Sequence, residues 1–187
     1  MMAEAELLGE RIRLRSFRPE DVDDVFAYAS DPEVTRLAGW EPHRSPLDSM
    51  AYIQRCRDEQ WGPITFAVEH RDDHRVVGVV DIRIISRLWG IGEIGYTLAR
   101  QYWGHGLNVE AGRLLLSYGF EHLRLRRIRA MCDADNQRSI RTMEKLGMSR
   151  EGYVTQDVGA RPVRRVVYSL VRRDWNRQAR PASLCSS

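Results

Sequence analysis

The residue types and spacing best suited to chemistry lie in the stretch from Gln101 to Ser139. Gly104 and Gly106 stand directly before an apolar run with helical spacing that covers residues 107–120. The first turn of a helix leaves about four N–H groups unpaired and carries roughly half a positive charge. Glycine lets an anion approach where a Cβ atom would collide with it. The turn at residues 104–108 therefore predicts a binding site for a diphosphate.

Two better-known phosphate motifs are excluded by the residues around this turn. A P-loop has Lys and then Ser or Thr after its last glycine, whereas Leu107 and Asn108 follow Gly106. A second glycine-rich stretch, residues 90–95, has the spacing of a dinucleotide fingerprint. That fingerprint must open a helix, but residues 96–98 continue a strand pattern. What remains is a Gln-x-x-Gly-x-Gly turn that enters a helix.

With this turn the chain resembles the GCN5-related N-acetyltransferase (GNAT) superfamily, in the branch of the RimJ and RimL protein N-terminal acetyltransferases. The resemblance covers most of residues 10–170, and the order and spacing of its pieces make it specific. The matching residues are Gly95 and Tyr96, Trp103 to Gly106, Glu110, Asn136 with Ser139, and the residues at 145–148 and 151–152. The chain departs from the usual family pattern at residues 107–111 and at Met148, which stands where Phe is usual.

The resemblance implies a thioester donor, acetyl-CoA, with no metal. It also implies two strands, 91–99 and 126–132, that splay apart so that pantetheine pairs with backbone between them. The expected coenzyme-binding residues are Tyr96, Thr97, Leu98, Trp103, Gly104, His105, Gly106, Leu107, Asn108 and Asn136. Glu110, in the first turn of the long helix, is expected to brace the glycine turn.

Acetyl transfer to an amine needs a group that accepts the amine's proton. The resemblance assigns this to Glu93, acting directly or through a water molecule, while an exposed strand glutamate without a role is the alternative. His105 is a competitor because its ordinary pKa suits proton transfer. Backbone N–H groups around residues 94–96 are the candidates for the oxyanion. There Gly95 predicts either a β-bulge or a glycine required by packing.

The leaving thiolate needs a hydrogen-bond donor, and the resemblance assigns this role to Ser139. It assigns Asn136 to pantetheine, although capping of the helix that begins there explains Asn136 equally well. The predicted catalytic residues are therefore Glu93 and Ser139.

Length and composition favour one globular domain at residues 1–173, which the resemblance implies is the acetyltransferase domain, followed by a disordered tail at 174–187. The chain has 187 residues, 43% apolar and 29% charged, with a net charge of +3. No run approaches the ~20 apolar residues of a membrane span, and no secretory signal is visible. Three scattered cysteines, Cys56, Cys132 and Cys185, lack metal-like or disulfide-like spacing, which favours the cytoplasm.

Periodicity predicts an α/β (α+β) fold, a mixed sheet of about seven strands flanked by about four helices. The expected strands are 11–15, 63–69, 75–84, 91–99, 126–132, 148–156 and 164–171. The expected helices are 19–31, 46–60, the long helix after residue 106, and 136–146. Residues 33–48 are expected to be a loop, the arginines of 11–15 to face solvent, and Leu47, Met50 and Ile53 to face inward.

The sequence leaves the acceptor open between a protein N-terminal α-amine and a small amine such as a polyamine or an aminoglycoside-like drug. A coenzyme A sensor without catalysis is a second reading of the same fold. Nucleic-acid binding is a third, less favoured because no reading motif accompanies the basic residues. Those residues are Arg161, Arg164, Arg165, Arg172, Arg173, Arg177 and Arg180. The resemblance also makes a homodimer plausible.

Overall fold

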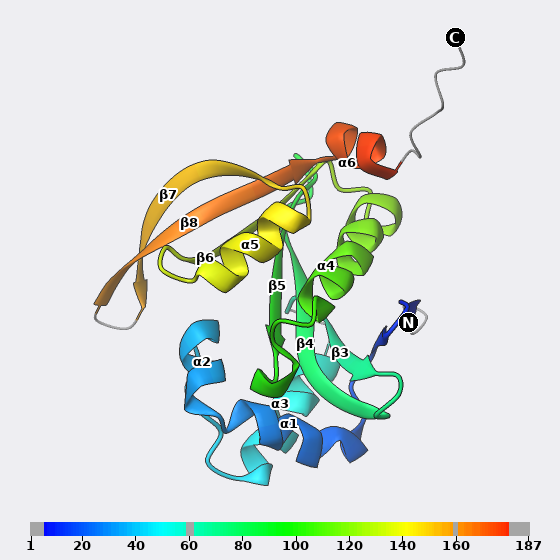
Figure 1. The fold of residues 1–187 in the computed structure, drawn as a ribbon, viewed down its shortest axis with the longest axis vertical. Coiled ribbons are helices and arrows are strands. Elements are labelled where there is room, and N and C mark those ends of the chain that lie inside the picture. Colours follow the sequence, from blue (N-terminus) through cyan, green and yellow to red (C-terminus); the bar gives the residue numbers. More distant parts are fainter. Residues whose placement is uncertain (1–5, 59–61, 159–160, 180–187) are drawn as a thin grey trace.

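The computed structural model describes residues 6–58, 62–158 and 161–179. Within them, one mixed sheet has its strands in the order β1-β2-β3-β4-β5-β6-β8-β7 (Figure 1). The strands are β1 (Leu7–Leu8), β2 (Ile12–Arg15), β3 (Ile64–His70), β4 (Arg75–Ser86), β5 (Ile91–Leu98), β6 (Arg127–Asp133), β7 (Ser149–Val158) and β8 (Arg161–Val171). The helices are α1 (Val22–Ala29), α2 (Pro32–Ala38), α3 (Pro46–Arg57), α4 (Leu107–Ser117), α5 (Gln137–Lys145) and α6 (Arg172–Ala179).

The predicted mixed sheet is confirmed, with eight strands in place of seven because the two-residue β1 was not expected. Around β4 the sheet is buried on both faces. Its residues Val80 and Ile82 pack in a core that includes α4, whereas Val76 and Val79 pack in a second core with α1 and α3. Figure 1 shows α1, α2 and α3 grouped at one end of the molecule, while α5 lies along β6 and β8.

The centre of the sheet splays as predicted. Strands β5 and β6 pair in parallel only from Ile91 opposite Arg127 to Ile94 opposite Ala130. Beyond that point β5 continues to Leu98 beside β4 alone, and β6 continues to Asp133 beside β8 alone. The facing edges of β5 and β6 therefore carry backbone groups that are not used in the ladder between them.

Helix α2 occupies residues for which a loop was expected, so that expectation is wrong. Its first turn is stabilised by Asp31, whose Oδ1 accepts the N–H of Glu33 at 2.9 Å, and by Pro32 at the first helical position. Gly39 ends the helix with a left-handed φ of 78°. These are ordinary helix signals, which the prolines at 42 and 46 obscured.

Helix α3 forms where expected, but it turns a different face inward. Ile53 is buried as predicted, whereas Leu47 is 71% exposed and Met50 is 54% exposed. The side that faces the protein instead carries Ser49, which is fully buried and whose Oγ lies 2.9 Å from His43 Nδ1. The contact between Ser49 and His43 therefore determines which face of α3 packs inward, whereas a count of apolar residues alone would choose another face.

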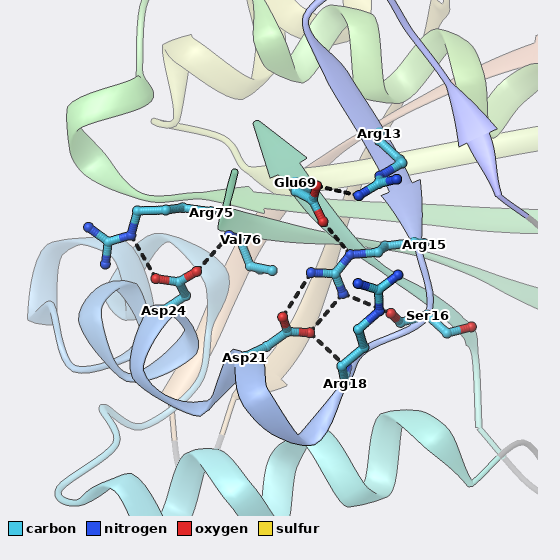
Figure 2. Close-up of polar contacts among 9 residues, drawn as sticks. All are labelled: Arg13, Arg15, Ser16, Arg18, Asp21, Asp24, Glu69, Arg75 and Val76. Atoms are coloured by element: carbon cyan, nitrogen blue, oxygen red, sulfur yellow. Dashed lines mark hydrogen bonds and ion pairs between the residues drawn. The ribbon is translucent and has the colours of Figure 1, made fainter. Parts of the chain in front are cut away.

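The arginines of β2 do not all face solvent, as Figure 2 shows. Arg15 is buried, and its two terminal nitrogens donate to the carboxylate of Asp21 at 2.8 Å each, while its Nε donates to Glu69. Arg13 donates to the other oxygen of Glu69. Burial favours the neutral form of Glu69, but the hydrogen bonds from Arg15 and Arg13 prevail and lower its pKa. The network joins β2, β3 and the turn before α1.

The C-terminal segment is ordered further than predicted, because α6 includes residues 174–179 of the expected tail. Residues 180–187, with Arg180 and Cys185, lie outside the described residues. Several of the basic residues bind within the protein: Arg172 donates to the carbonyl oxygen of Leu125 at 3.0 Å, Arg165 lies 3.3 Å from Asp133, and Arg173 and Arg177 each lie 3.4 Å from Asp174. In the described part of the chain, no helix is long and apolar enough to cross a membrane.

Candidate active site

A cavity of about 710 Å³ opens where β5 and β6 diverge. Its walls come from β4, β5, β6, α2, α4 and α5 and from the turn before α4. All the predicted site residues except His105 line it: Glu93, Tyr96, Thr97, Leu98, Trp103, Gly104, Gly106, Leu107, Asn108, Asn136 and Ser139. Residues more than forty positions apart in the sequence thus share one space.

The turn that enters α4 fits a diphosphate. Gly104 and Gly106 have left-handed φ values of 85° and 80°, which only glycine adopts without strain. A Cβ atom built on Gly104 would have no atom within 4 Å, so the space in front of the turn is open. Beside it, the side-chain oxygen of Asn108 is buried without a hydrogen-bond partner. A buried polar atom of this kind calls for a partner from outside the protein.

Glu110 braces this turn, as predicted. Its Oε1 accepts the backbone N–H of Arg11 at 2.8 Å, and its Oε2 accepts Arg11 Nε at 3.0 Å. Arg11 in turn donates to the carbonyl oxygen of His105 at 2.8 Å. His105 is exposed and does not line the cavity, so the structure gives its imidazole no place in the site.

The far end of β5 is fixed by Trp103, whose indole N–H donates to the carbonyl oxygen of Leu98 at 2.8 Å. The guanidinium of Arg138 lies over the indole ring, 4.8 Å from its centre. Trp103 therefore holds the glycine turn against the strand end. The carbonyl of Leu98 already has one partner, which leaves a single lone pair for an incoming amide.

Tyr96, Asn136 and Ser139 form a connected group on the α5 side of the cavity. The hydroxyls of Tyr96 and Ser139 lie 2.8 Å apart, and Tyr96 Oη also lies 3.2 Å from the carbonyl oxygen of Ser139. Asn136 Oδ1 accepts the N–H of Ser139 at 3.1 Å, so the capping role of Asn136 is confirmed. Burial raises the pKa of Tyr96, and its hydroxyl therefore stays protonated and available as a hydrogen-bond donor.

Glu93 lies on the other face of the sheet from Tyr96, because the two residues are three positions apart on one strand. It faces Arg129 across the β5–β6 pair, and Arg129 Nε donates to Glu93 Oε2 at 2.7 Å. The hydroxyls of Tyr96 and Ser139 and the predicted base Glu93 are thus on opposite sides of the sheet. The opening between β5 and β6 connects them.

The expected bulge at Gly95 is wrong, since the register of β4 and β5 shows no shift there. Gly95 lies directly opposite Asp81, and a Cβ atom on Gly95 would come within 2.6 Å of Asp81 Oδ2. The packing explanation for Gly95 is therefore correct. The neighbouring N–H groups of β5 remain candidates for the oxyanion because the ladder with β6 ends at Ile94.

Sequence reasoning missed several residues that line the cavity, among them the titratable Asp81 and Cys132. Burial raises the pKa of the Asp81 carboxyl to about 6, with Arg83 opposing the rise and Glu93 adding to it. Burial likewise raises the pKa of the Cys132 thiol, so the thiol lines the cavity near Ser139 in its neutral form. One signal for Asp81 was present: it is a single acid within the apolar run Val79 to Ile82.

The comparison with known families agrees with this fold. A family model described as "Acetyltransferase (GNAT) domain" matches residues 11–149. The chain belongs to this family of acetyltransferases, whose members use acetyl-CoA as donor and an amine as acceptor. It is 31% identical over 173 residues to the "Uncharacterized N-acetyltransferase p20" of Bacillus licheniformis, covering 90% of this chain and 97% of that protein.

Two further proteins show that the fold serves different acceptors. The spermidine N(1)-acetyltransferase of Escherichia coli is 28% identical over 142 residues, covering 75% of this chain and 74% of that protein. The structure of the ribosomal-protein-S5-alanine acetyltransferase from Vibrio fischeri superimposes with a TM-score of 0.74 at 23% identity, covering 92% and 99% of the two chains. The likeness at 23% identity shows the fold alone.

Proposed function

We propose that this acetyltransferase moves the acetyl group of acetyl-CoA to the N-terminal α-amine of a protein or peptide. The observation that supports this acceptor is the charge balance on the Glu93 side of the cavity. Glu93 is paired with Arg129 and Asp133 with Arg165. In the described part of the chain, Asp81 is the cavity-lining carboxylate without an ion pair. One unpaired carboxylate suits an acceptor with one ammonium group.

A polyamine carries several ammonium groups and needs a carboxylate for each. The cavity instead carries an excess of basic side chains. They are Arg83, Arg138, Arg141, Lys145 and Arg165. Arg83, which lies opposite Glu93 on the same face of the sheet, suits the carbonyl groups that a peptide has directly after its amine.

The reaction divides among the residues as follows. The turn at 104–108 holds the diphosphate, and the free edge of β5 holds the pantetheine amides. N–H groups around residues 94–96 bind the oxyanion. Glu93, fixed by Arg129, holds the water on the path by which the amine's proton leaves. When Tyr96 donates to Ser139 Oγ, the hydroxyl proton of Ser139 is available for the departing sulfur.

The test is acetylation of a defined panel by the purified protein, read by mass spectrometry and by release of free coenzyme A. The panel contains short peptides that begin with Ala or Ser, the same peptides with a blocked N-terminus, and spermidine. We expect acetylation of the free peptides alone, at the α-amine. Preference for spermidine would replace the proposed acceptor with a polyamine. Tight acetyl-CoA binding without acetylation of any amine would support the sensor instead.

A further inference from the structure

Asp81 and Glu93 lie on the same face of the sheet, the face opposite Tyr96 and Ser139, where we expect the acceptor to bind. Asp81 is opposite Gly95, and Arg83 is opposite Glu93, in a register without a shift between them. Residues two apart on a strand share a face, so Glu93 is the diagonal neighbour of Asp81. Diagonal neighbours are roughly 7–8 Å apart. This strand spacing lets one ammonium group or one water molecule lie between the two side chains.

The carboxylate of Asp81 lies over the backbone of Gly95, since a Cβ atom there would be 2.6 Å from Oδ2. Gly95 is the first residue of β5 beyond the ladder with β6, where the strands open. The N–H groups proposed for the oxyanion belong to residues 94–96, and Gly95 is the middle one of these. Asp81 is thus next to the point at which an acetyl carbonyl bound to those N–H groups would be attacked.

The surroundings of Asp81 keep it without a fixed counter-ion. The titratable and charged groups that face it are Arg83 on its own strand, Glu93 on β5, and Tyr52 and Cys56 on α3. Burial raises the pKa of both Tyr52 and Cys56, so both are neutral near pH 7. Glu93 is engaged with Arg129. A cation brought by the substrate would therefore find Asp81 as its partner.

We infer that Asp81 binds the acceptor's ammonium group and accepts the proton that this group must lose before it attacks the thioester. The inference rests on the proposed function and adds a second carboxylate to the same site. Its role differs from that of Glu93: Asp81 touches the reacting nitrogen, while Glu93 with Arg129 holds the water beside it.

The proton and electron balance is complete with the groups named. An N–H bond of the ammonium breaks and its proton passes to the Asp81 carboxylate. The amine lone pair forms the C–N bond, and the C=O electrons move to the oxyanion. When the oxyanion collapses, the C–S bond breaks and sulfur receives a proton that nitrogen loses, through Ser139 or water. Asp81 then releases its proton to solvent, one for each acetyl group transferred.

The carboxyl pKa supports this role. A carboxyl at about 6 is ionised near pH 7, yet it is a stronger base than an ordinary aspartate. A peptide α-amine has a pKa of roughly 7.7–8.0. If Asp81 receives the ammonium form, kcat/KM against pH is a bell with limbs near these two values.

The experiment compares Asp81→Asn, Glu93→Gln and Asp23→Asn with the wild-type protein, using an Ala-initiated peptide. Asp23 is exposed on α1 and serves as the matched Asp-to-Asn control. We expect Asp81→Asn to lower kcat/KM by about 10²-fold near pH 7 and to move the acid limb up to the amine's own pKa. Glu93→Gln should lower kcat/KM and move the limb only slightly down, because burial is the main cause of the raised pKa of Asp81. Acetyl-CoA affinity should be unchanged in all three, and Asp81→Glu should restore the limb.

A readout without turnover accompanies the kinetics. Because folding raises the pKa of the Asp81 carboxyl, the folded protein loses stability as the pH rises through that pKa and the buried carboxyl becomes charged. Asp81→Asn removes this charge. The variant should therefore have a higher Tm than the wild-type protein at about pH 8, but not at about pH 4. An acid limb and rate unchanged in Asp81→Asn would overturn the role of Asp81 and leave the acetyltransferase intact. Acetyl-CoA binding by the wild-type protein without acetylation of any amine would overturn both.

Discussion

Ser139 is positioned by two neighbours with different roles. Asn136 holds its backbone N–H at 3.1 Å, and Tyr96 lies 2.8 Å from its hydroxyl. We propose that this ordered hydroxyl stabilises the developing thiolate by donating a hydrogen bond to sulfur. Because the hydrogen bond to sulfur strengthens as negative charge develops, it stabilises the transition state more than the ground state.

We therefore expect Ser139→Ala to lower kcat by about tenfold to a hundredfold with little change in acetyl-CoA affinity. Steady-state kinetics and calorimetric titration of the same preparation measure the two quantities. Tyr96→Phe is the companion variant, since it removes the partner of Ser139 but keeps the ring. A wild-type rate in Ser139→Ala would mean that solvent or another side chain protonates sulfur.

A second prediction at residue scale concerns the diphosphate turn. Gly106→Val places a branched Cβ on a left-handed residue in front of α4 and should weaken acetyl-CoA binding at least tenfold, about 1.4 kcal/mol. Gly39→Val is the matched control, because Gly39 has a similar φ of 78° but does not line the cavity. Both variants should lose thermal stability, and only Gly106→Val should lose affinity. Equal affinities would argue against the turn as the phosphate site.

Single residues were predictable from sequence where a local pattern carried the information. The glycine turn, Asn136 with Ser139, and Glu93 all fall within short motifs, and all line the cavity. Asp81 was not predictable in this way, because its place depends on the register that sets it opposite Gly95. Arg129 was missed for the same reason.

At the scale of elements, the buried charges around Arg15 fasten the first long strand to its neighbours (Figure 2). The side chains of Arg15, Asp21 and Glu69 are each less than 10% exposed. Removing one charge from such a group leaves the others buried and unpaired, which costs more than a surface pair contributes. The network therefore makes the position of β2 sensitive to single substitutions.

We predict that Arg15→Met destabilises the protein by about 3–5 kcal/mol in denaturant titrations. Arg75→Met is the control: Arg75 pairs with Asp24 at 2.8 Å, but its side chain is 56% exposed, so the loss should stay under about 1 kcal/mol. Because the pKa of Glu69 is lowered on folding, its contribution is present above about pH 4.3 and is lost as the pH falls through the folded pKa. Similar losses in both variants at neutral pH would contradict this account.

Element types followed from periodicity, and the two errors have separate causes. The hairpin of β3 and β4, strand β5 and the capped helix α5 were predicted because each carries its own pattern. Helix α2 was missed because a seven-residue helix has too few turns for a clear stripe, and the face of α3 was wrong because Ser49 bonds to His43. A hydrogen bond between buried polar side chains depends on the tertiary structure, so a pattern of hydrophobic residues does not predict it.

At the scale of the whole molecule, the splay connects the two faces of one sheet. The glycine turn, Tyr96 and Ser139 belong to the face covered by α4 and α5, whereas Asp81, Glu93 and α2 belong to the other. On the proposed function, we expect donor and acceptor to approach from opposite sides and to meet where β5 leaves β6. The sequence indicated the splay through family resemblance, but the division of roles between the two faces required the register.

A crystal structure of the protein with coenzyme A and an Ala-initiated peptide tests the central claim most directly. We predict the diphosphate against the N–H groups of residues 104–108, the pantetheine between β5 and α5, and the peptide nitrogen within hydrogen-bond distance of Asp81. A coenzyme bound elsewhere, or a peptide amine on the same side of the sheet as Ser139, would contradict the account.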